Sequence, residues 1–406
     1  MPPDELTRAL AMLEADGFES GAAAIRHLLP DLRGRDLLDA LLALGSAAMW
    51  AEQTDEALVC AERSVELADA GDPEMRGPSL ALLSQVLGQR GLDGDLDRAL
   101  ELGDRALEAW VPGVRAADLE QHESLHGLAH YWVGRYPEAA DLCRRGGDGA
   151  TEALALTALG RPEDAIEVGD AAIASAREAG SAMLTAYALC CSTAALRDVL
   201  DLAEARRRNE EATELFRGIG FESGVMQGEM DLLYADLAAD DVASAHRVWP
   251  GLWSRLADAS GWERWLAPGR LSVAHAEIAA KKERWEEAVE AAIGAIEIAR
   301  RIGRVKYDVS ARIVLGTAQL GLGKVSDSVH ALRTAADDAD RLGHPPARWR
   351  AHAALARALD AAGDDDGATT TSVRAAEIAK AYVTTLGTQH AEQVLASPEL
   401  RAILPV

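Results

Sequence analysis

The sequence contains few aromatic residues and few of the residues that favour β-strands. Phe, Tyr and Trp together make up 4% of the 406 residues. Val, Ile and Thr, which pack well on a pleated sheet, are sparse beside the Ala, Leu, Glu, Asp and Arg that dominate the chain. Because strong helix formers prevail throughout, the composition predicts an all-α protein.

Cysteine and long apolar runs are also scarce. The four cysteines include the adjacent pair Cys190 and Cys191, and none has the CxxC spacing of a zinc or redox motif. No stretch of about 18 uncharged apolar residues is present, which argues against a membrane span. The N-terminal residues lack the basic and apolar regions of a secretory signal. We therefore expect a cytoplasmic protein with reduced thiols and no membrane partner.

Positive charge is in deficit, since the formal net charge is −25 at pH 7. A surface of this sign repels phosphate backbones, so nucleic acid is not expected as a partner. The sequence also lacks the G-x-x-x-x-G-K-[ST] phosphate loop, the glycine fingerprint of dinucleotide-binding folds and a nucleophile elbow. It therefore predicts no cofactor.

What the chain does have is a repeat of about forty residues. Small residues recur with successive gaps of 42, 40, 26, 40, 40, 43, 40 and 40. This first column comprises Ala57, Ala99, Ala139, Ala165, Ala205, Ala245, Ala288, Ser328 and Ala368. A second column, seven residues later, comprises Ser64, Ala106, Gly146, Ala172, Ala212, Leu252, Ala295, Ala335 and Ala375. Seven residues make two helical turns, so both columns lie on one helix face and allow a neighbouring helix to approach closely.

The two columns predict nine helix hairpins over residues 34–387, within a single array that spans residues 1–406. We expect a helix pair at about residues 4–29 before the hairpins and a capping helix at about 388–397, within the terminal segment 388–406. The 26-residue gap predicts a truncated second helix in the hairpin around residues 137–147, where CRRGGDGAT interrupts the pattern. One hairpin cannot bury its apolar stripe alone, but a stack of hairpins can.

The segments GRYPEAA (134–140) and WEEAVEAAIGAIEIA (285–299) resemble the turn and the second helix of the tetratricopeptide repeat (TPR) family. The resemblance implies a right-handed superhelical solenoid of about nine to ten antiparallel hairpins, with an inner groove formed mainly by the first helices. The period of about 40 residues is similar to that of the helical-repeat region of MalT-like bacterial regulators. The nucleotide-binding and DNA-binding parts of those regulators find no counterpart in this sequence, so their functions are not carried over.

Four of the nine tryptophans stand in one stretch, WPGLWSRLADASGWERWLAPGR (249–270). Leu252 occupies a column that is otherwise tiny, and Pro250 falls inside a second helix, so we expect this hairpin to be splayed. Pro268 is expected to start the next helix, with WERWL as an extra turn before it.

Two interpretations of these tryptophans stay open. In the first, the indoles fill the widened seam as core. In the second, some stay partly exposed and bind a peptide, a sugar face or a cationic group. The candidate ligand-binding residues are Trp249, Trp253, Trp262 and Trp265.

The segment HESLHGLAH (122–130) contains the HExxH pattern of zinc peptidases. In that pattern two histidines, here His122 and His126, bind zinc, and the glutamate, here Glu123, is the general base. The metzincin continuation is absent, and a straight helix places His122 and His130 about 12 Å apart, so these two cannot share one zinc. The alternatives are a packed or polar-networked row of histidines and adventitious metal binding.

The predicted architecture offers a long concave surface and no evident reactive centre. We therefore expect non-enzymatic recognition by a scaffold or sensor that binds a peptide, a protein partner or a small effector in the groove, in bacterial signalling or transcription regulation. The rival hypotheses are a metal-dependent hydrolase that uses the HESLH motif and a purely structural subunit. The oligomeric state does not follow from the sequence.

Overall fold

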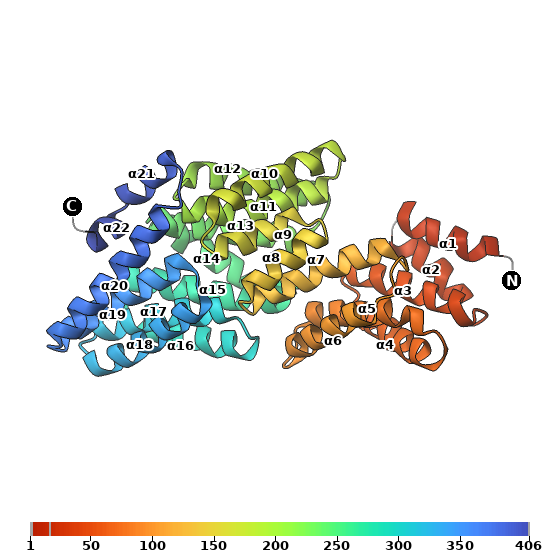
Figure 1. Cartoon of the computed structure of the whole chain (residues 1–406), viewed down its shortest axis with the longest axis horizontal. Coiled ribbons are helices and arrows are strands. Elements are labelled where there is room, and N and C mark those ends of the chain that lie inside the picture. Colours follow the sequence, from red (N-terminus) through yellow and green to blue (C-terminus); the bar gives the residue numbers. More distant parts are fainter. Residues whose placement is uncertain (1–2, 16–17, 405–406) are drawn as a thin grey trace. The chain divides into compact units, whose positions relative to one another are not determined.

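The computed structural model describes residues 3–15 and 18–404. Over these residues it contains 22 α-helices, two short 3-10 helices and no strand. The helices pack in consecutive pairs, as Figure 1 shows. The predicted all-α, TPR-like solenoid fold is confirmed. None of the described helices is both long enough and apolar enough to cross a membrane.

The helix pair α1 (Pro3–Ala15) and α2 (Phe18–Leu28) precedes nine hairpins in the described part of the chain. The first helices of these hairpins are α3 (Gly34–Trp50), α5 (Arg76–Arg90), α7 (Ala116–Trp132), α9 (Gly149–Ala158), α11 (Ala182–Asp198), α13 (Glu222–Ala238), α15 (Glu263–Lys281), α17 (Val305–Gly321) and α19 (Pro345–Ala361). The second helices are α4 (Thr54–Gly71), α6 (Asp95–Ala109), α8 (Tyr136–Arg145), α10 (Pro162–Glu178), α12 (Leu202–Gly218), α14 (Val242–Ser254), α16 (Trp285–Arg301), α18 (Val325–Leu342) and α20 (Asp365–Val383). Two short helices follow, α21 (Thr388–Ala396) and α22 (Pro398–Ile403).

The first column of small residues lies on the second helices, as the repeat spacing predicts. Its members are buried, and Ala205, for example, is 0% exposed. Two hairpins illustrate how closely the paired helices approach. The hydroxyl of Ser328 on α18 donates to the carbonyl oxygen of Gly316 on α17 at 2.7 Å. A Cβ at Gly45 on α3 would lie 2.9 Å from the Cβ of Cys60 on α4, so a larger residue there would push this hairpin apart.

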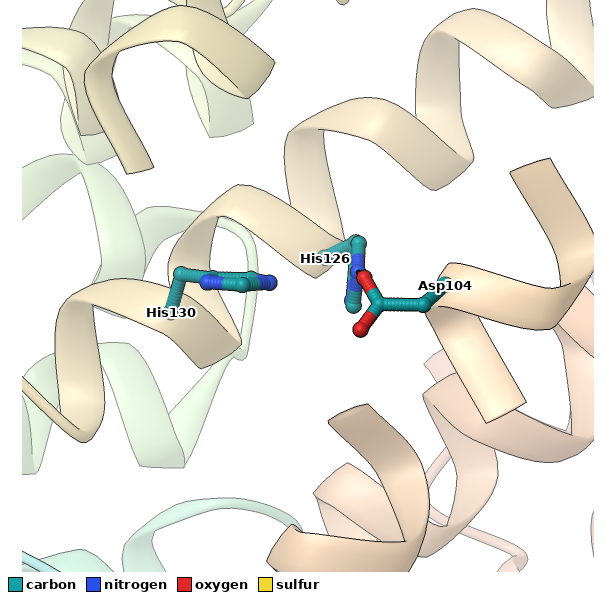
Figure 2. Close-up of side chains that lie close together, drawn as sticks. All are labelled: Asp104, His126 and His130. Atoms are coloured by element: carbon teal, nitrogen blue, oxygen red, sulfur yellow. Dashed lines mark hydrogen bonds and ion pairs between the residues drawn. The ribbon is translucent and has the colours of Figure 1, made fainter. Parts of the chain in front are cut away.

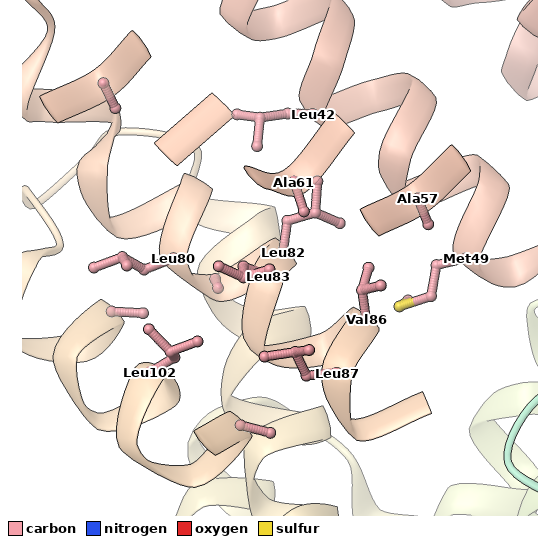
Figure 3. Close-up of a cluster of buried hydrophobic side chains, with 14 of the residues drawn as sticks. Leu42, Met49, Ala57, Ala61, Leu80, Leu82, Leu83, Val86, Leu87 and Leu102 are labelled. Atoms are coloured by element: carbon pink, nitrogen blue, oxygen red, sulfur yellow. The ribbon is translucent and has the colours of Figure 1, made fainter. Parts of the chain in front are cut away.

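The helices form two compact units. Unit 1 comprises residues 1–129, 145–147 and 260–265, and unit 2 comprises residues 130–144, 148–259 and 266–406. The division therefore falls within α7 and within α15. In unit 1, leucines and Val86 from α5 pack against side chains of α3, α4 and α6, as Figure 3 shows. Several smaller apolar clusters form the core of unit 2.

The irregular repeats show one confirmed prediction and one correction. The predicted truncation is confirmed, because α8 has only ten residues, and α9 after it is equally short. The prediction that Pro268 starts a helix is wrong, because α15 begins at Glu263 and Pro268 lies inside it. The indole of Trp265 is buried and donates to the carbonyl oxygen of Gln89 at 3.1 Å. This anchoring holds the WERWL turn in a helical conformation even though Pro268 cannot donate a hydrogen bond.

Candidate functional site

Two of the four candidate tryptophans lie together in unit 2, on α14. Trp249 donates from Nε1 to the carbonyl oxygen of Leu271 at 2.8 Å, and its ring stacks on His275 with 4.2 Å between the centroids. The Trp249 ring also stacks on the ring of Trp253, with 5.2 Å between the centroids. Trp249 is half-buried, whereas Trp253 is 40% exposed. One indole is therefore fixed by packing, and the other offers part of a face to solvent.

The other two candidate tryptophans lie in unit 1. Trp262 packs at a tilt against Trp50, with 5.5 Å between the ring centroids. Trp265 is buried beside Gly91, where a Cβ would lie 2.2 Å from the indole, so Gly91 leaves the space that this ring fills. Trp249 and Trp253 thus stack on each other in unit 2, whereas Trp262 and Trp265 each contact other residues of unit 1.

The histidines of the HESLH segment are buried on α7. The ring of His122 stacks on that of His126, with 5.4 Å between the centroids and 12° between the planes. Burial and the neighbouring His126 lower the pKa of His122 to about 4, so its ring is neutral at pH 7. Because a carbonyl oxygen only accepts hydrogen bonds, the Nε2–H of His122 donates to Gly103 at 3.1 Å. In this tautomer the Nε2 atom of His122 carries a proton and is not a metal ligand.

His126 has a different set of neighbours. Its Nε2 lies 2.9 Å from Oδ1 of Asp104 on α6, and His130 follows one turn later on α7. One ligand atom each from Asp104, His126 and His130 lie within 4.8 Å of one another, and Figure 2 shows the three side chains. Two imidazoles and a carboxylate are a ligand set that zinc accepts. The structure therefore groups His126 with Asp104 and His130, and His122 lies outside this group.

Unit 2 contains a polar network that the sequence interpretation did not identify. Asp231 on α13 is 4% exposed, and its Oδ1 accepts from Arg197 on α11 at 3.2 Å and from Arg270 on α15 at 2.7 Å. Its Oδ2 accepts from Gln227 at 2.9 Å and from the thiol of Cys190 at 3.1 Å. Burial alone would raise the pKa of Asp231, but Arg270 and Arg197 together hold it below its usual value. One ionised aspartate therefore links three successive first helices.

Members of this network belong to a set of polar side chains that recurs at the repeat spacing. The positions are 40, 43, 40 and 40 residues apart, and these gaps equal those of the small column over the same hairpins. We name this set the polar row, and it comprises Tyr187, Gln227, Arg270, Ser310 and Arg350, on α11, α13, α15, α17 and α19. Applying the repeat spacing to the first helices, and not only to the second, would have revealed it in the sequence.

The polar row is accessible in part. Tyr187, Gln227 and Ser310 are half-buried, Arg350 is exposed, and Arg270 is 7% exposed. Hydrogen bonds fix several of these side chains in place. The Tyr187 hydroxyl lies 2.7 Å from the hydroxyl of Thr151, and Gln227 Oε1 accepts from Arg270 at 2.7 Å. Positioned donors and acceptors at a regular spacing suit recognition of an extended polar ligand.

Comparison with known proteins supports the fold. No family model matches the chain, and no curated protein matches it. Among solved structures, a Rap protein complexed with Competence and Sporulation Factor matches with a TM-score of 0.54 at 12% identity, over 94% of this chain and 99% of that chain. A Rap conjugation gene regulator of plasmid pLS20 in complex with the Phr* peptide matches with a TM-score of 0.46 at 12% identity, over 95% and 98%. Yeast Tom70 matches with a TM-score of 0.38 at 12% identity, over 98% and 96%. At this identity the likeness to the first Rap protein shows a common TPR-like fold and nothing finer.

Proposed function

We propose that this chain is a non-enzymatic recognition scaffold or sensor that binds a peptide, or an extended segment of a partner protein, along the polar row of unit 2. The observation that carries the proposal is the polar row itself. Equivalent positions on five successive first helices bear hydrogen-bonding side chains, and three of these side chains are half-buried. An extended peptide presents main-chain donors and acceptors at regular intervals, so a regular array of side-chain partners matches it.

Two further observations support this proposal. Asp231 joins α11, α13 and α15 through buried hydrogen bonds, so the side chains of the polar row are held in place before a ligand arrives. The Rap protein that shares the fold is complexed with Competence and Sporulation Factor, and this supports a binding role in bacterial signalling or regulation.

Selection of displayed random peptides on the full chain tests the proposal. Peptides that bind are measured by calorimetry against wild type, Gln227→Ala and, as a control on the second-helix surface, the exposed Glu290→Ala. We expect Gln227→Ala to weaken binding about tenfold or more, since it removes positioned polar partners, and Glu290→Ala to leave it within about twofold. Binding that is insensitive to Gln227→Ala but lost with Trp253→Ala would move the site to α14 and refute the assignment to the polar row.

Metal analysis separates this function from the hydrolase hypothesis. Stoichiometric zinc that is lost in both His122→Ala and His126→Ala would favour the HESLH motif and a hydrolase. Zinc that is lost in His126→Ala but retained in His122→Ala would instead match the grouping of Asp104, His126 and His130. The second pattern would leave the HESLH motif without its catalytic arrangement, because the two histidines of that motif would not share the metal.

A further inference from the structure

Arg304 is a buried cation in unit 2. It precedes α17 directly, as the N-cap residue of that helix, and is 5% exposed. Within the described residues, its Nε and Nη1 have no hydrogen-bond acceptor. The guanidinium lies over the ring of Tyr307, 4.5 Å from the centroid, and this contact stabilises the charge but accepts no in-plane N–H. A buried arginine is normally paired, so Arg304 departs from the rule.

Comparable positions in the same chain show what Arg304 lacks. Arg284, the N-cap residue of α16, is partly exposed and forms an ion pair with Glu287 at 2.9 Å. Arg161, the N-cap residue of α10, forms one with Asp164 at 2.6 Å. His344 stands one repeat after Arg304, is equally buried, and has Asp198 as its partner at 2.8 Å. Each of these residues has a carboxylate from the chain itself.

Burying the charged guanidinium of Arg304 with unsatisfied N–H donors costs a large amount of free energy. A guanidinium does not lose its proton under protein conditions, so burial cannot neutralise it as it can a lysine or a histidine. The N-terminus of the 17-residue helix α17 carries a partial positive charge of its own beside it. The positive charge of Arg304 and the partial positive charge of the helix N-terminus therefore lie close together, and a bound anion would stabilise both.

The surroundings of Arg304 add further donors. Lys306, two residues later, is half-buried, and burial lowers the pKa of its ammonium group while Asp198 partly opposes this. Tyr131, in the last turn of α7, and Tyr136, the first residue of α8, interact electrostatically with Arg304. Burial raises the pKa of both phenols, so their hydroxyls stay protonated. Lys306 also precedes Ser310 of the polar row by one helical turn, on the same face of α17.

We propose that Arg304 and Lys306, at the start of α17, form a binding site for an oxyanion, the carboxylate or phosphate group of a ligand. Arg304 supplies planar N–H donors that match either group, and Lys306 supplies a second positive charge. The site lies one helical turn before Ser310, the member of the polar row on α17. Its existence does not depend on the proposed function, since a free small anion would bind there in the absence of any peptide.

Titration of the full chain with sodium phosphate and, separately, with sodium acetate tests the proposal, with ionic strength held constant by sodium chloride. We expect a saturable rise in the melting temperature of the wild type, because a ligand that binds only the folded state stabilises it. We expect Arg304→Met to raise the calorimetric Kd about tenfold or more, and the matched control Arg284→Met to leave it within about twofold. A response to phosphate alone identifies a phosphate site, and a response to both anions identifies a site that accepts carboxylates.

Two outcomes would overturn the proposal. One is the lack of any effect of either anion beyond that of sodium chloride. The other is an equal effect in wild type and Arg304→Met. If Arg304→Met fails to fold, Lys306→Met provides the same test, with an expected rise in Kd of about threefold or more. A stability measurement without added oxyanion is a further check. Arg304→Met should then be no less stable than wild type, whereas an arginine with a purely structural role would destabilise the protein when replaced.

Discussion

Arg270 on α15 donates a hydrogen bond to Asp231 on α13 at 2.7 Å, and both side chains are more than nine-tenths buried. Arg197 on α11 donates to the same carboxylate oxygen. The two arginines therefore share one carboxylate. These contacts join first helices that are about forty residues apart in the chain. Such a buried pair adds little net stability relative to an apolar pair, but breaking it leaves charges without partners. We infer that its role is to fix the relative placement of neighbouring first helices in unit 2.

The first prediction concerns Asp231→Asn. Removing the negative charge leaves Arg197 and Arg270 uncompensated, so we expect the free energy of unfolding to fall by about 3–5 kcal/mol. Because the arginines lower the pKa of Asp231 in the folded state, its contribution is present above the usual carboxyl range and is lost as the pH falls through the folded value. The variant should therefore lose less stability in acid than the wild type does.

Urea denaturation followed by circular dichroism, at neutral pH and in acid, measures both effects. The exposed Asp327→Asn on α18 is the control and should change stability by less than about 0.5 kcal/mol. A change for Asp231→Asn as small as that of the control would show that the network does not hold the helices together.

The second prediction concerns the one large residue in the second small column. Leu252 on α14 is 2% exposed and packs in an apolar cluster with residues of α13 and α15. Leu252→Ala should open a cavity and cost about 2–5 kcal/mol. Ala295 on α16 holds the equivalent position and is 0% exposed, so Ala295→Leu should overpack and cost about 1–3 kcal/mol.

Denaturation midpoints of the two variants and of the double variant test this prediction. The sites are in different hairpins, so their effects should be nearly additive. Tolerance of leucine at position 295 without loss of stability would show that small residues are not required for hairpin stacking.

The third prediction concerns the acid sensitivity of unit 1. The pKa of His122 is lowered to about 4 by burial and by His126, from an ordinary value of 6.5. A group with a lowered pKa of this kind stabilises the fold fully above pH 6.5, and this contribution is lost as the pH falls toward 4. The loss from His122 should reach roughly 3 kcal/mol.

His122→Gln keeps a donor for the carbonyl oxygen of Gly103 but does not titrate. Urea denaturation of this variant between pH 7 and pH 4 should therefore show a smaller loss of stability than wild type over the same interval. The exposed His27→Gln serves as control and should follow the wild type. Identical slopes for all three proteins would mean that the protonation of His122 does not couple to folding.

The sequence predicted those parts of the fold that depend on local periodicity. The small columns located nine hairpins because each column member, such as Ala205, must face the partner helix of its own hairpin. The 26-residue gap and the interruption of the pattern at CRRGGDGAT located the truncated helix α8. Short helix α22 was missed, since six residues carry too little periodicity to indicate a helix.

The candidate sites were harder to predict because they depend on contacts between segments far apart in the chain. Nothing local in the sequence shows that Trp265 contacts Gln89 or that Trp262 packs on Trp50, because these partners lie about 175 to 210 residues earlier in the chain. The HExxH spacing places His122 and His126 one turn apart, but the partner of His126, Asp104, comes from the preceding helix. The Asp231 network likewise joins residues of three repeats. The only sequence signal that indicates it is the recurrence of polar residues at the repeat spacing.

The last prediction separates the two interpretations of the α14 tryptophans. Trp249 is held by a hydrogen bond to Leu271 and by stacking on His275, so Trp249→Ala should cost about 2–4 kcal/mol as a core truncation. Trp253 is 40% exposed and stacks on Trp249 with one face, so Trp253→Ala should cost only about 1 kcal/mol. Urea denaturation measures both values, and Trp253→Phe should retain most of the stacking contribution. If Trp253 binds a ligand, Trp253→Ala will abolish ligand-induced quenching of tryptophan fluorescence while stability stays near that of wild type. A stability loss for Trp253→Ala as large as that for Trp249→Ala would instead show that both indoles are core, and would remove α14 from the candidate binding surfaces.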